Sequence, residues 1–245
     1  MNILEIKNLK KIYHTKNEEF LAVENFSFNL KKGEFVAIVG PSGCGKSTIL
    51  SILCGLEKKS EGTIKHNQNI KFGYMLQKDN LFEWRTIYKN CLLGLEIQKV
   101  KNKKQYIETL LKKYGLYEFR NNYPSNLSGG MRQRVSLIRT LAIKPDILLL
   151  DEPFSALDYQ TRLAVSEDVY KIIKKENIST IMITHDISEA ISMADKVIVL
   201  SKRPSKIKNI YKIKLKNKQT PIENRKDENF QKYYEQIWKD IDCHV

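Results

Sequence analysis

The small residues and single lysine between positions 40 and 48 have the spacing of a loop that binds a phosphate chain. They fit the pattern G-x-x-x-x-G-K-[S/T], in which glycines let backbone N–H groups approach phosphate oxygens closely. In this pattern the lysine ammonium reaches the terminal phosphates, and the next hydroxyl binds Mg²⁺. The residues expected to contact the nucleotide are Gly40, Pro41, Ser42, Gly43, Cys44, Gly45, Lys46, Ser47 and Thr48.

The cysteine inside this loop has two interpretations that the sequence leaves open. Cys44 is either an inert filler or a thiol whose pKa is lowered by the loop N–H groups and by Lys46. The other three cysteines show no CxxC spacing, which favours reduced thiols in a cytosolic protein.

A pair of carboxylates follows a second apolar run, residues 147–150. Asp151 is suited to hold Mg²⁺ together with Ser47, either directly or through water. Glu152 is suited to orient the attacking water or to accept its proton. A helix-start cap is the structural alternative for Asp-Glu-Pro. Next to a phosphate loop, we expect Glu152 and Lys46 to be catalytic.

Two polar residues each follow a predicted strand. Ligands of parallel α/β sheets bind beyond the carboxyl ends of the strands, where Gln77 and His185 would lie. The Gln77 amide would touch Mg²⁺ or the water, and His185 would contact the γ-phosphate during catalysis. Either residue alone would be an ordinary surface side chain, and the other motifs make it part of the site.

Leu-Ser-Gly-Gly-Met at positions 127–131 provides a second device for binding anions. Ser128 is a good N-cap, and Gly129 and Gly130 expose backbone N–H groups at the positive end of the following helix. Because residues 40–47 already hold one phosphate chain, we expect this device to serve the nucleotide of a second, identical subunit. A two-fold pair would then enclose two ATP molecules. An ordinary helix cap is the alternative.

Apolar runs that alternate with amphipathic segments predict the framework for these residues. Residues 35–39 predict a strand buried on both faces, leading into the phosphate loop and a helix over 48–53. Continued alternation to position 200 predicts an α/β fold with a parallel-sheet core. The other predicted strands are 3–6, 26–30, 62–64, 71–76, 147–150, 179–184 and 196–200, with 62–64 and 71–76 in a hairpin around Asn67, and the other predicted helices are 131–143, 161–175 and 187–193.

The region between positions 79 and 126 has a different character, since its apolar residues recur at helical spacing. We therefore expect one domain over 1–245. Its nucleotide-binding core would comprise 1–78 and 127–205, with an inserted helical lobe at 79–126 and a short C-terminal extension at 206–245. No apolar run reaches the roughly 18–20 residues that span a bilayer, and the first residues do not resemble an export signal.

The formal net charge of +14 suits two kinds of partner, nucleic acid or an anionic membrane surface. A source organism whose proteins are generally rich in lysine would explain the charge without any such partner. A loose cluster of lysines at 202–218 alternates with apolar residues. This alternation favours an edge strand with a solvated lysine face over a dedicated anion-binding patch.

The order of these motifs resembles the ATP-binding subunit of ABC transporters over essentially the whole chain. The resemblance implies the ABC ATPase fold, which adds an antiparallel β subdomain and an inserted α-helical subdomain to the P-loop core. It implies ATP and Mg²⁺ as cofactors, Tyr13 as the aromatic residue that stacks on adenine, and Asp158 within Ser-Ala-Leu-Asp as a further nucleotide-site residue.

A finer resemblance is to the importer branch for nitrate, sulfonates and taurine. It is carried by Leu-Ser-Gly-Gly-Met-Arg-Gln-Arg-Val at 127–135, Asp-Glu-Pro-Phe-Ser-Ala-Leu-Asp at 151–158, and the segments 161–162, 184–187, 203–204 and 77–86. That branch usually has proline where this chain has Glu83.

The resemblance implies the energy-coupling ATPase of an importer, peripheral to the cytoplasmic face of the cell membrane. Its partners would be a second copy of itself in a head-to-tail ATP sandwich, an integral-membrane permease docked near 77–86, and indirectly an extracytoplasmic solute-binding protein. Phe82 and Trp84 would serve the docking, unless they fill the core of the lobe. No nucleic acid is expected.

The competing function is a soluble ABC-type ATPase that acts on ribosomes or nucleic acid. The basic charge mildly favours it, but such proteins usually have tandem cassettes or long coiled-coil insertions, and this sequence shows neither.

Overall fold

A mostly parallel six-stranded sheet forms the centre of the computed structural model, which describes residues 1–14, 18–100, 103–216 and 219–242. The strand order is β5-β6-β7-β3-β8-β9; the first five strands are parallel and β9 pairs antiparallel with β8. Every residue of β3, β6 and β7 is buried, as expected for strands covered on both faces. The strands are β3 (Phe35–Val39), β5 (Phe72–Met75), β6 (Ile147–Asp151), β7 (Ser179–Ile183), β8 (Lys196–Leu200) and β9 (Ile207–Lys212).

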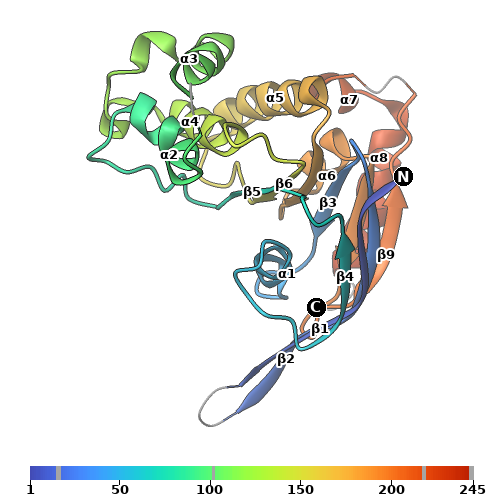
Figure 1. Ribbon diagram of the computed structural model, residues 1–245. Helices are drawn as coiled ribbons and strands as arrows, with labels where there is room; N and C mark the ends of the chain where they lie inside the picture. The colour runs from blue at the N-terminus through green and yellow to red at the C-terminus, as the bar shows by residue number, and fades with distance from the viewer. Residues whose placement is uncertain (15–17, 101–102, 217–218, 243–245) are drawn as a thin grey trace.

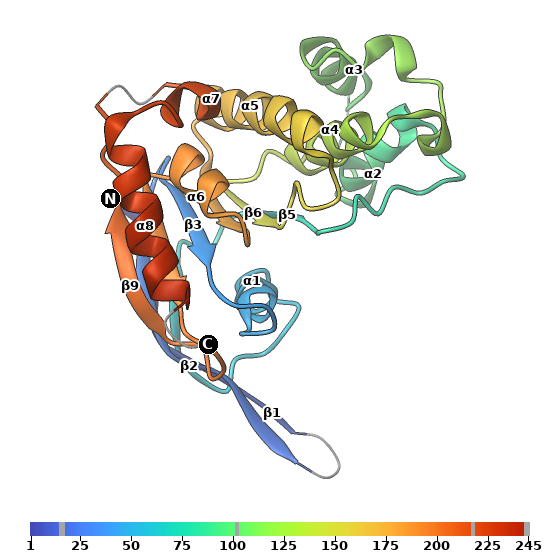
Figure 2. The ribbon, with the colours of Figure 1, turned by 180° about the vertical axis from the view of Figure 1, so that it is seen from behind.

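A separate antiparallel sheet confirms the predicted β subdomain. It consists of β1 (Asn2–His14), β2 (Glu19–Lys31) and β4 (Glu61–His66), in the order β2-β1-β4. The far ends of β1 and β2 extend from the body of the protein as an arm (Figures 1 and 2). The predicted hairpin around Asn67 is wrong, because β4 pairs with β1 whereas β5 pairs with β6 in the other sheet. Ile64 of β4 packs beneath the antiparallel sheet, and Met75 of β5 enters the core on the opposite face of the central sheet.

Helices cover both faces of the central sheet. Helix α1 (Lys46–Leu53) shares an apolar core with β1, β2 and one face of β3, so it lies between the two sheets. The opposite face packs on α4 (Gly129–Leu141), α5 (Tyr159–Glu176), α6 (Ile187–Met193) and α8 (Glu228–Asp242). The predicted strands 35–39 and 196–200 and the predicted helix 187–193 are confirmed at both ends.

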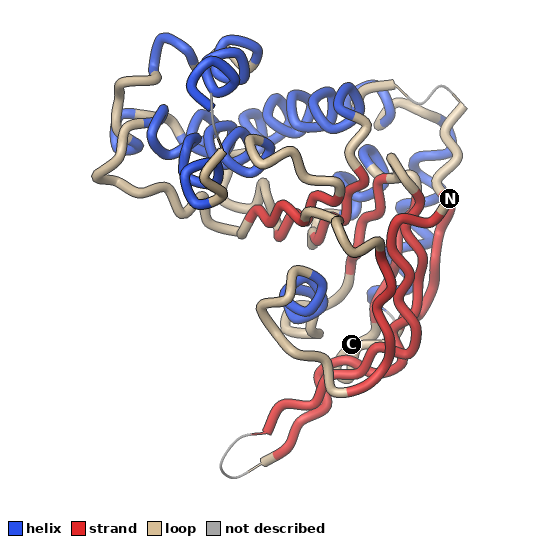
Figure 3. Tube along the Cα trace, viewed as in Figure 1, coloured by secondary structure: helices blue, strands red, loops and turns tan. Residues whose placement is uncertain are grey.

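The helical character of the 79–126 region is confirmed by α2 (Ile87–Ile97) and α3 (Lys103–Lys113), with 3₁₀ turns at Tyr117–Phe119 and Pro124–Asn126. These helices form a third apolar core together with one side of α4. Figure 3 shows this helical group at one end of the strands. No helix among the described residues is long and apolar enough to cross a membrane.

The last part of the chain covers the edge of the central sheet. Strand β9 is the predicted edge strand, and α8 runs beside it (Figure 2). A short helix, α7 (Pro221–Asn224), precedes α8. Phe230 and Ile237 confirm the predicted packing face of α8, but Trp238 is 49% exposed and stacks on Tyr234.

Candidate functional site

The phosphate loop connects β3 to α1, as its motif requires. Gly45 precedes α1 at φ 114°, a left-handed conformation that favours glycine because a side chain there would clash with its own backbone. Lys46 is 6% exposed, and its Nζ donates hydrogen bonds of 2.8 Å to the carbonyl oxygens of both Gly40 and Pro41. The lysine ammonium is thus held within the loop whose N–H groups it must supplement.

The thiol inside the loop is not activated. Cys44 is 2% exposed, and this burial raises its pKa by more than Lys46 lowers it. The hypothesis of a reactive Cys44 is therefore wrong for this structure, and the inert-filler interpretation fits.

An oxygen-lined position lies between the loop and the end of β6. The Ser47 hydroxyl donates to Asp151 Oδ1 over 3.1 Å, and the Tyr74 hydroxyl donates to Asp151 Oδ2 over 3.1 Å. Burial raises the pKa of Asp151, although both hydroxyl bonds act in the opposite direction. A hydroxyl and one carboxylate suit Mg²⁺, which usually takes one or two protein carboxylates and completes its shell with phosphate and water. Sequence reasoning missed Tyr74, whose approach to Asp151 depends on the pairing of β5 with β6.

Three residues predicted from different parts of the sequence meet beside this position. Glu152 Oε2 lies 3.1 Å from His185 Nδ1 and 3.4 Å from Gln77 Nε2. Gln77 also reaches the Ser155 hydroxyl at 3.5 Å, and that hydroxyl donates to the Glu152 carbonyl. Their strands β5, β6 and β7 are adjacent in the sheet, so their carboxyl ends bring the side chains together. The cluster can orient a water molecule beside the Mg²⁺ position and accept its proton.

The family of the chain follows from comparison with known proteins. A family model described as ABC transporter matches residues 23–155. The chain belongs to the ABC transporter ATP-binding family. It is an ABC ATPase, and its sheets and helices have the ABC ATPase fold.

Relatives of this ABC ATPase match over nearly their whole length. The nitrate import ATP-binding protein NrtD of Synechocystis is 37% identical, over 96% of this chain and 93% of that relative. The aliphatic sulfonates import ATP-binding protein SsuB of Bacillus cereus is 35% identical, over 96% and 94%. YtlC of Bacillus subtilis, an uncharacterized ABC transporter ATP-binding protein, is 40% identical over 98% and 96%.

Solved structures of similar fold include the dimeric ABC transporter cassette MJ0796. It has a TM-score of 0.74 and 31% identity, covering 86% of this chain and 99% of that one. A second dimeric structure of MJ0796, in a post-hydrolysis state with ADP and phosphate, gives a TM-score of 0.72 at the same identity and coverage.

The Ser-Gly-Gly motif of the ABC ATPase begins α4. Ser128 is the N-cap, and its hydroxyl oxygen accepts a hydrogen bond from the Met131 N–H. Gly130 packs tightly on α5, since a Cβ there would lie 2.9 Å from Thr161 Cγ2 and 3.2 Å from Val165 Cγ2. Ser128 therefore acts as a helix cap. This cap uses the Met131 N–H and not the N–H groups of Gly129 and Gly130, which lie in the first turn of α4 and can still bind a ligand.

Asp158 and Tyr13 each have local contacts. Asp158 caps α5 by accepting a hydrogen bond from the Thr161 N–H, and its pKa is lowered by the side-chain and backbone hydrogen bonds of Thr161. The Tyr13 hydroxyl lies 3.5 Å from the Thr48 hydroxyl of the phosphate loop. Its ring stacks on Phe20 at 5.1 Å, and Lys11 Nζ lies 4.5 Å from the ring centre. A base that stacks on Tyr13 would therefore contact a ring that already contacts Phe20 and Lys11.

The segment 79–86 is anchored to α4 by charge. Arg132 donates to both carboxylate oxygens of Asp79, at 2.7 and 3.1 Å, and to Glu83 at 2.7 Å. Arg139 donates to the carbonyl oxygens of Asp79 and Asn80, each at 2.6 Å. Helix α4 begins at the Ser-Gly-Gly motif, so the segment and the motif are parts of one connected unit. We call this set of contacts the arginine anchor.

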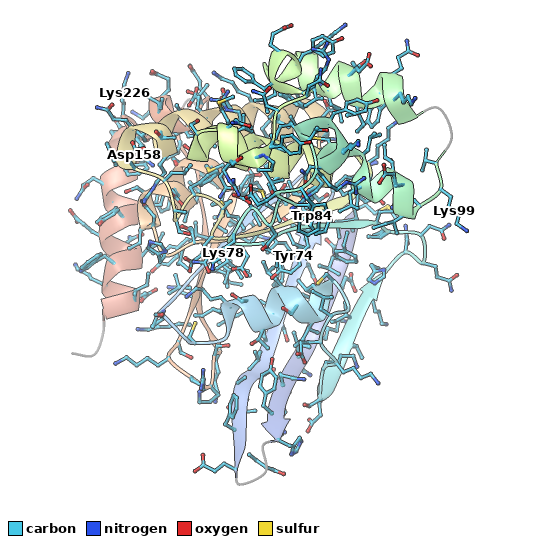
Figure 4. The ribbon with its side chains drawn as sticks, turned by 90° about the vertical axis from the view of Figure 1, so that its left-hand side faces the viewer. Tyr74, Lys78, Trp84, Lys99, Asp158 and Lys226 are labelled. Atoms are coloured by element: carbon cyan, nitrogen blue, oxygen red, sulfur yellow. The ribbon has the colours of Figure 1, made fainter. Side chains whose placement is uncertain are left out.

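A buried asparagine shapes the rest of the segment. Asn90 is fully buried, accepts from the Phe82 N–H, and donates to the carbonyl oxygens of Phe82, Arg85 and Thr86. Trp84 in this segment is 74% exposed, so the alternative in which it fills the core of the lobe is wrong. Figure 4 labels Trp84 and Lys78 in the view from the left-hand side of Figure 1. A polar residue within the apolar stripe of 87–95 was the signal for Asn90.

Proposed function

We propose that this ABC ATPase is the ATP-hydrolysing energy-coupling subunit of an importer for nitrate, sulfonate, taurine or a similar small solute. The meeting of Glu152, Gln77 and His185 beside Ser47 and Asp151 carries the proposal of hydrolysis. The import names of NrtD and SsuB support the direction of transport. The subunit would act at the cytoplasmic face of the cell membrane, with a permease and an extracytoplasmic solute-binding protein as partners.

The proposed chemistry assigns one task to each group. Mg²⁺ would supply positive charge to the terminal phosphates, and Ser47, Asp151 and Gln77 would hold it. Lys46 and the loop N–H groups would bind the β and γ phosphates, and Tyr13 would stack on adenine. Glu152 would take the proton of the attacking water, while His185 would contact the γ-phosphate.

The permease would dock on the exposed part of the 79–86 segment. Trp84 offers a large apolar side chain, and Phe82 lies against it with ring centres 4.8 Å apart. The arginine anchor would pass a displacement of this segment to α4 and hence to Ser128. We propose the division into core (1–78 and 127–205), helical lobe (79–126) and extension (206–245), with α4 joining core and lobe.

Two subunits would pair head to tail, so that Ser128, Gly129, Gly130 and Asp158 of one face the nucleotide of the other. The dimeric MJ0796 cassette structures support this pairing. A cross-link tests it: cysteines replace Ser42 and Ser128 in a background lacking the native cysteines. We expect an ATP-dependent bond between two chains. A bond formed only within one chain would overturn the arrangement.

Membrane association separates this function from action on ribosomes or nucleic acid. Co-purification of the chain with membranes that contain its permease supports the importer. Co-purification with ribosomes instead would overturn it.

A further inference from the structure

The connection between β8 and β9 touches both ends of the proposed nucleotide site. Arg203 Nη2 donates a 2.8 Å hydrogen bond to the Gly43 carbonyl of the phosphate loop. The same guanidinium lies over the Phe20 ring, with its central carbon 5.1 Å from the ring centre. Phe20 in turn stacks on Tyr13, at 5.1 Å and an interplanar angle of 27°. One side chain therefore links the phosphate loop to the aromatic pair on the arm.

A further contact connects Tyr13 back to the end of the phosphate loop. The Tyr13 hydroxyl lies 3.5 Å from the hydroxyl of Thr48, which follows the loop in the first turn of α1. The contacts thus run from Gly43 through Arg203, Phe20 and Tyr13 back to Thr48. Tyr13 and Phe20 pair near the far ends of β1 and β2, which extend from the body as an arm (Figures 1 and 2), so the contacts with Thr48 and Arg203 attach this arm to the phosphate loop and the β8–β9 connection.

The backbone next to Arg203 is held in place by Ser205, two residues further on. Ser205 is fully buried, its N–H donates to the Ala22 carbonyl, and its carbonyl accepts from the Glu24 N–H, each over 3.0 Å. These bonds attach the connection to β2 beside the phosphate loop. A Cβ on Gly45 would lie 3.3 Å from the Ser205 hydroxyl, so the two segments are in close contact.

The contacts of Arg203 within the described residues are a carbonyl oxygen and an aromatic ring, and neither neutralises its charge. A planar guanidinium can stack on an aromatic face and donate in its own plane at the same time, which a lysine ammonium cannot do. The geometry therefore depends on arginine and not on positive charge alone.

We propose that Arg203 is a positioning residue that holds the Phe20–Tyr13 pair at a fixed distance from the phosphate loop. The base of a nucleotide can then stack on Tyr13 while its phosphates occupy the loop. The inference rests on the proposed stacking of adenine on Tyr13. It predicts that Arg203 contributes to the affinity for the base and not to the affinity for the phosphate chain.

The test compares a non-hydrolysable ATP analogue with inorganic tripolyphosphate, which has no base, by calorimetry or competition. We expect Arg203→Met and Arg203→Lys to raise the Kd of the analogue about 3- to 10-fold, the range of a cation–π contact. The Kd of tripolyphosphate should stay within about twofold. Arg203→Lys keeps the charge, so it serves as a second variant if Arg203→Met folds poorly.

A double-mutant cycle tests the route through Phe20. Phe20→Leu should weaken the analogue similarly, and adding Arg203→Met should change little, because both remove the same contact. The matched control is Lys206→Met, which removes a cation from the same connection; Lys206 pairs with Glu24 and is 54% exposed. It should bind both ligands normally.

Four results would overturn the inference. Unchanged binding of the analogue by both Arg203 variants would remove Arg203 from the site. Equal weakening of both ligands would show that it acts on the phosphates. If Tyr13→Ala does not affect the analogue, the adenine assignment fails and the inference fails with it. If Tyr13→Ala weakens the analogue and Arg203→Met does not, only the inference fails.

Discussion

Asp79→Asn is the most direct test of the arginine anchor. This isosteric change removes the charge that accepts two hydrogen bonds from Arg132, but keeps the backbone carbonyl that accepts from Arg139. It also places an amide N–H₂ against a guanidinium, so one acceptor is replaced by a donor. The Leu81 N–H also donates to Asp79 Oδ1, at 3.0 Å, and an Asn side chain can still accept this bond through its amide oxygen, so most of the loss should come from the Asp79–Arg132 pair.

The burial of this pair sets the size of the effect. The Arg132 and Asp79 side chains are 24% and 21% exposed, between a surface ion pair and a buried one. Surface pairs contribute about 0–1 kcal/mol and broken buried pairs cost about 3–5 kcal/mol, so we expect a loss of about 1–2 kcal/mol. For a protein of this size, that lowers Tm by about 2–8 °C.

The pH dependence of the effect has a definite sign. Burial alone would raise the pKa of Asp79, but the hydrogen bonds from Arg132 and the Leu81 N–H lower it below its ordinary value of 3.8. The stabilisation is therefore present at neutral pH and is lost as pH falls below 3.8. The difference between wild type and Asp79→Asn should shrink in the same range.

Chemical unfolding of wild type, Asp79→Asn, Arg132→Gln and the double variant measures the coupling energy. The matched control is Asp168→Asn, because Asp168 pairs with Arg134 at 3.5 Å and is 45% exposed. We expect the control to lose less than about 0.5 kcal/mol. A coupling energy of Asp79 with Arg132 below about 0.3 kcal/mol, the usual error of additivity, would refute the reasoning.

Three further predictions concern the site and its surroundings. Glu152→Gln should lower phosphate release by about 100-fold or more while ATP titrations stay nearly normal, because the shape remains and the proton acceptor is lost; turnover within a few-fold of wild type would contradict this. Trp84→Ala should leave Tm unchanged, because the side chain is 74% exposed, yet abolish co-purification with the permease; an unfolded variant would contradict the docking role. Burial raises the pKa of Glu189 from 4.5 to about 7, so the folded protein binds a proton at Glu189 more tightly than the unfolded chain does. The resulting contribution to the free energy of unfolding is fully present below pH 4.5 and is lost as pH rises through 7. Glu189→Gln should therefore gain Tm relative to wild type between pH 5 and pH 8, and an equal difference at both pH values would count against it.

The sequence predicted the elements whose evidence is local. Residues 35–39 and 196–200 are continuous apolar runs, and both are confirmed as strands with those bounds. The meeting of Glu152, Gln77 and His185 was predictable because each follows a strand of one parallel sheet. The phosphate loop was predictable because its chemistry requires glycines and lysine at fixed spacing.

The features that the sequence did not predict depend on contacts between distant segments. Nothing near Asn67 shows that β4 and β5 enter different sheets, because each strand pairs with a partner far along the chain. The bond from Tyr74 to Asp151 follows from that pairing. The 74% exposure of Trp84 could not be read from its apolar type, because it depends on how the 79–86 segment folds against the lobe.

The arginine anchor has a consequence for building hybrid transporters. An engineer who wants this ATPase to drive a different permease would exchange the 79–86 segment, the proposed permease contact, for that of another ABC ATPase. The segment does not end at its own residues, because Asp79 and Glu83 share Arg132, and Arg139 holds the carbonyls of Asp79 and Asn80. The exchangeable module is therefore discontinuous: it includes two positions of α4 some fifty residues downstream. A graft that moves the segment alone would carry the proposed docking surface without the two arginines that attach it to α4.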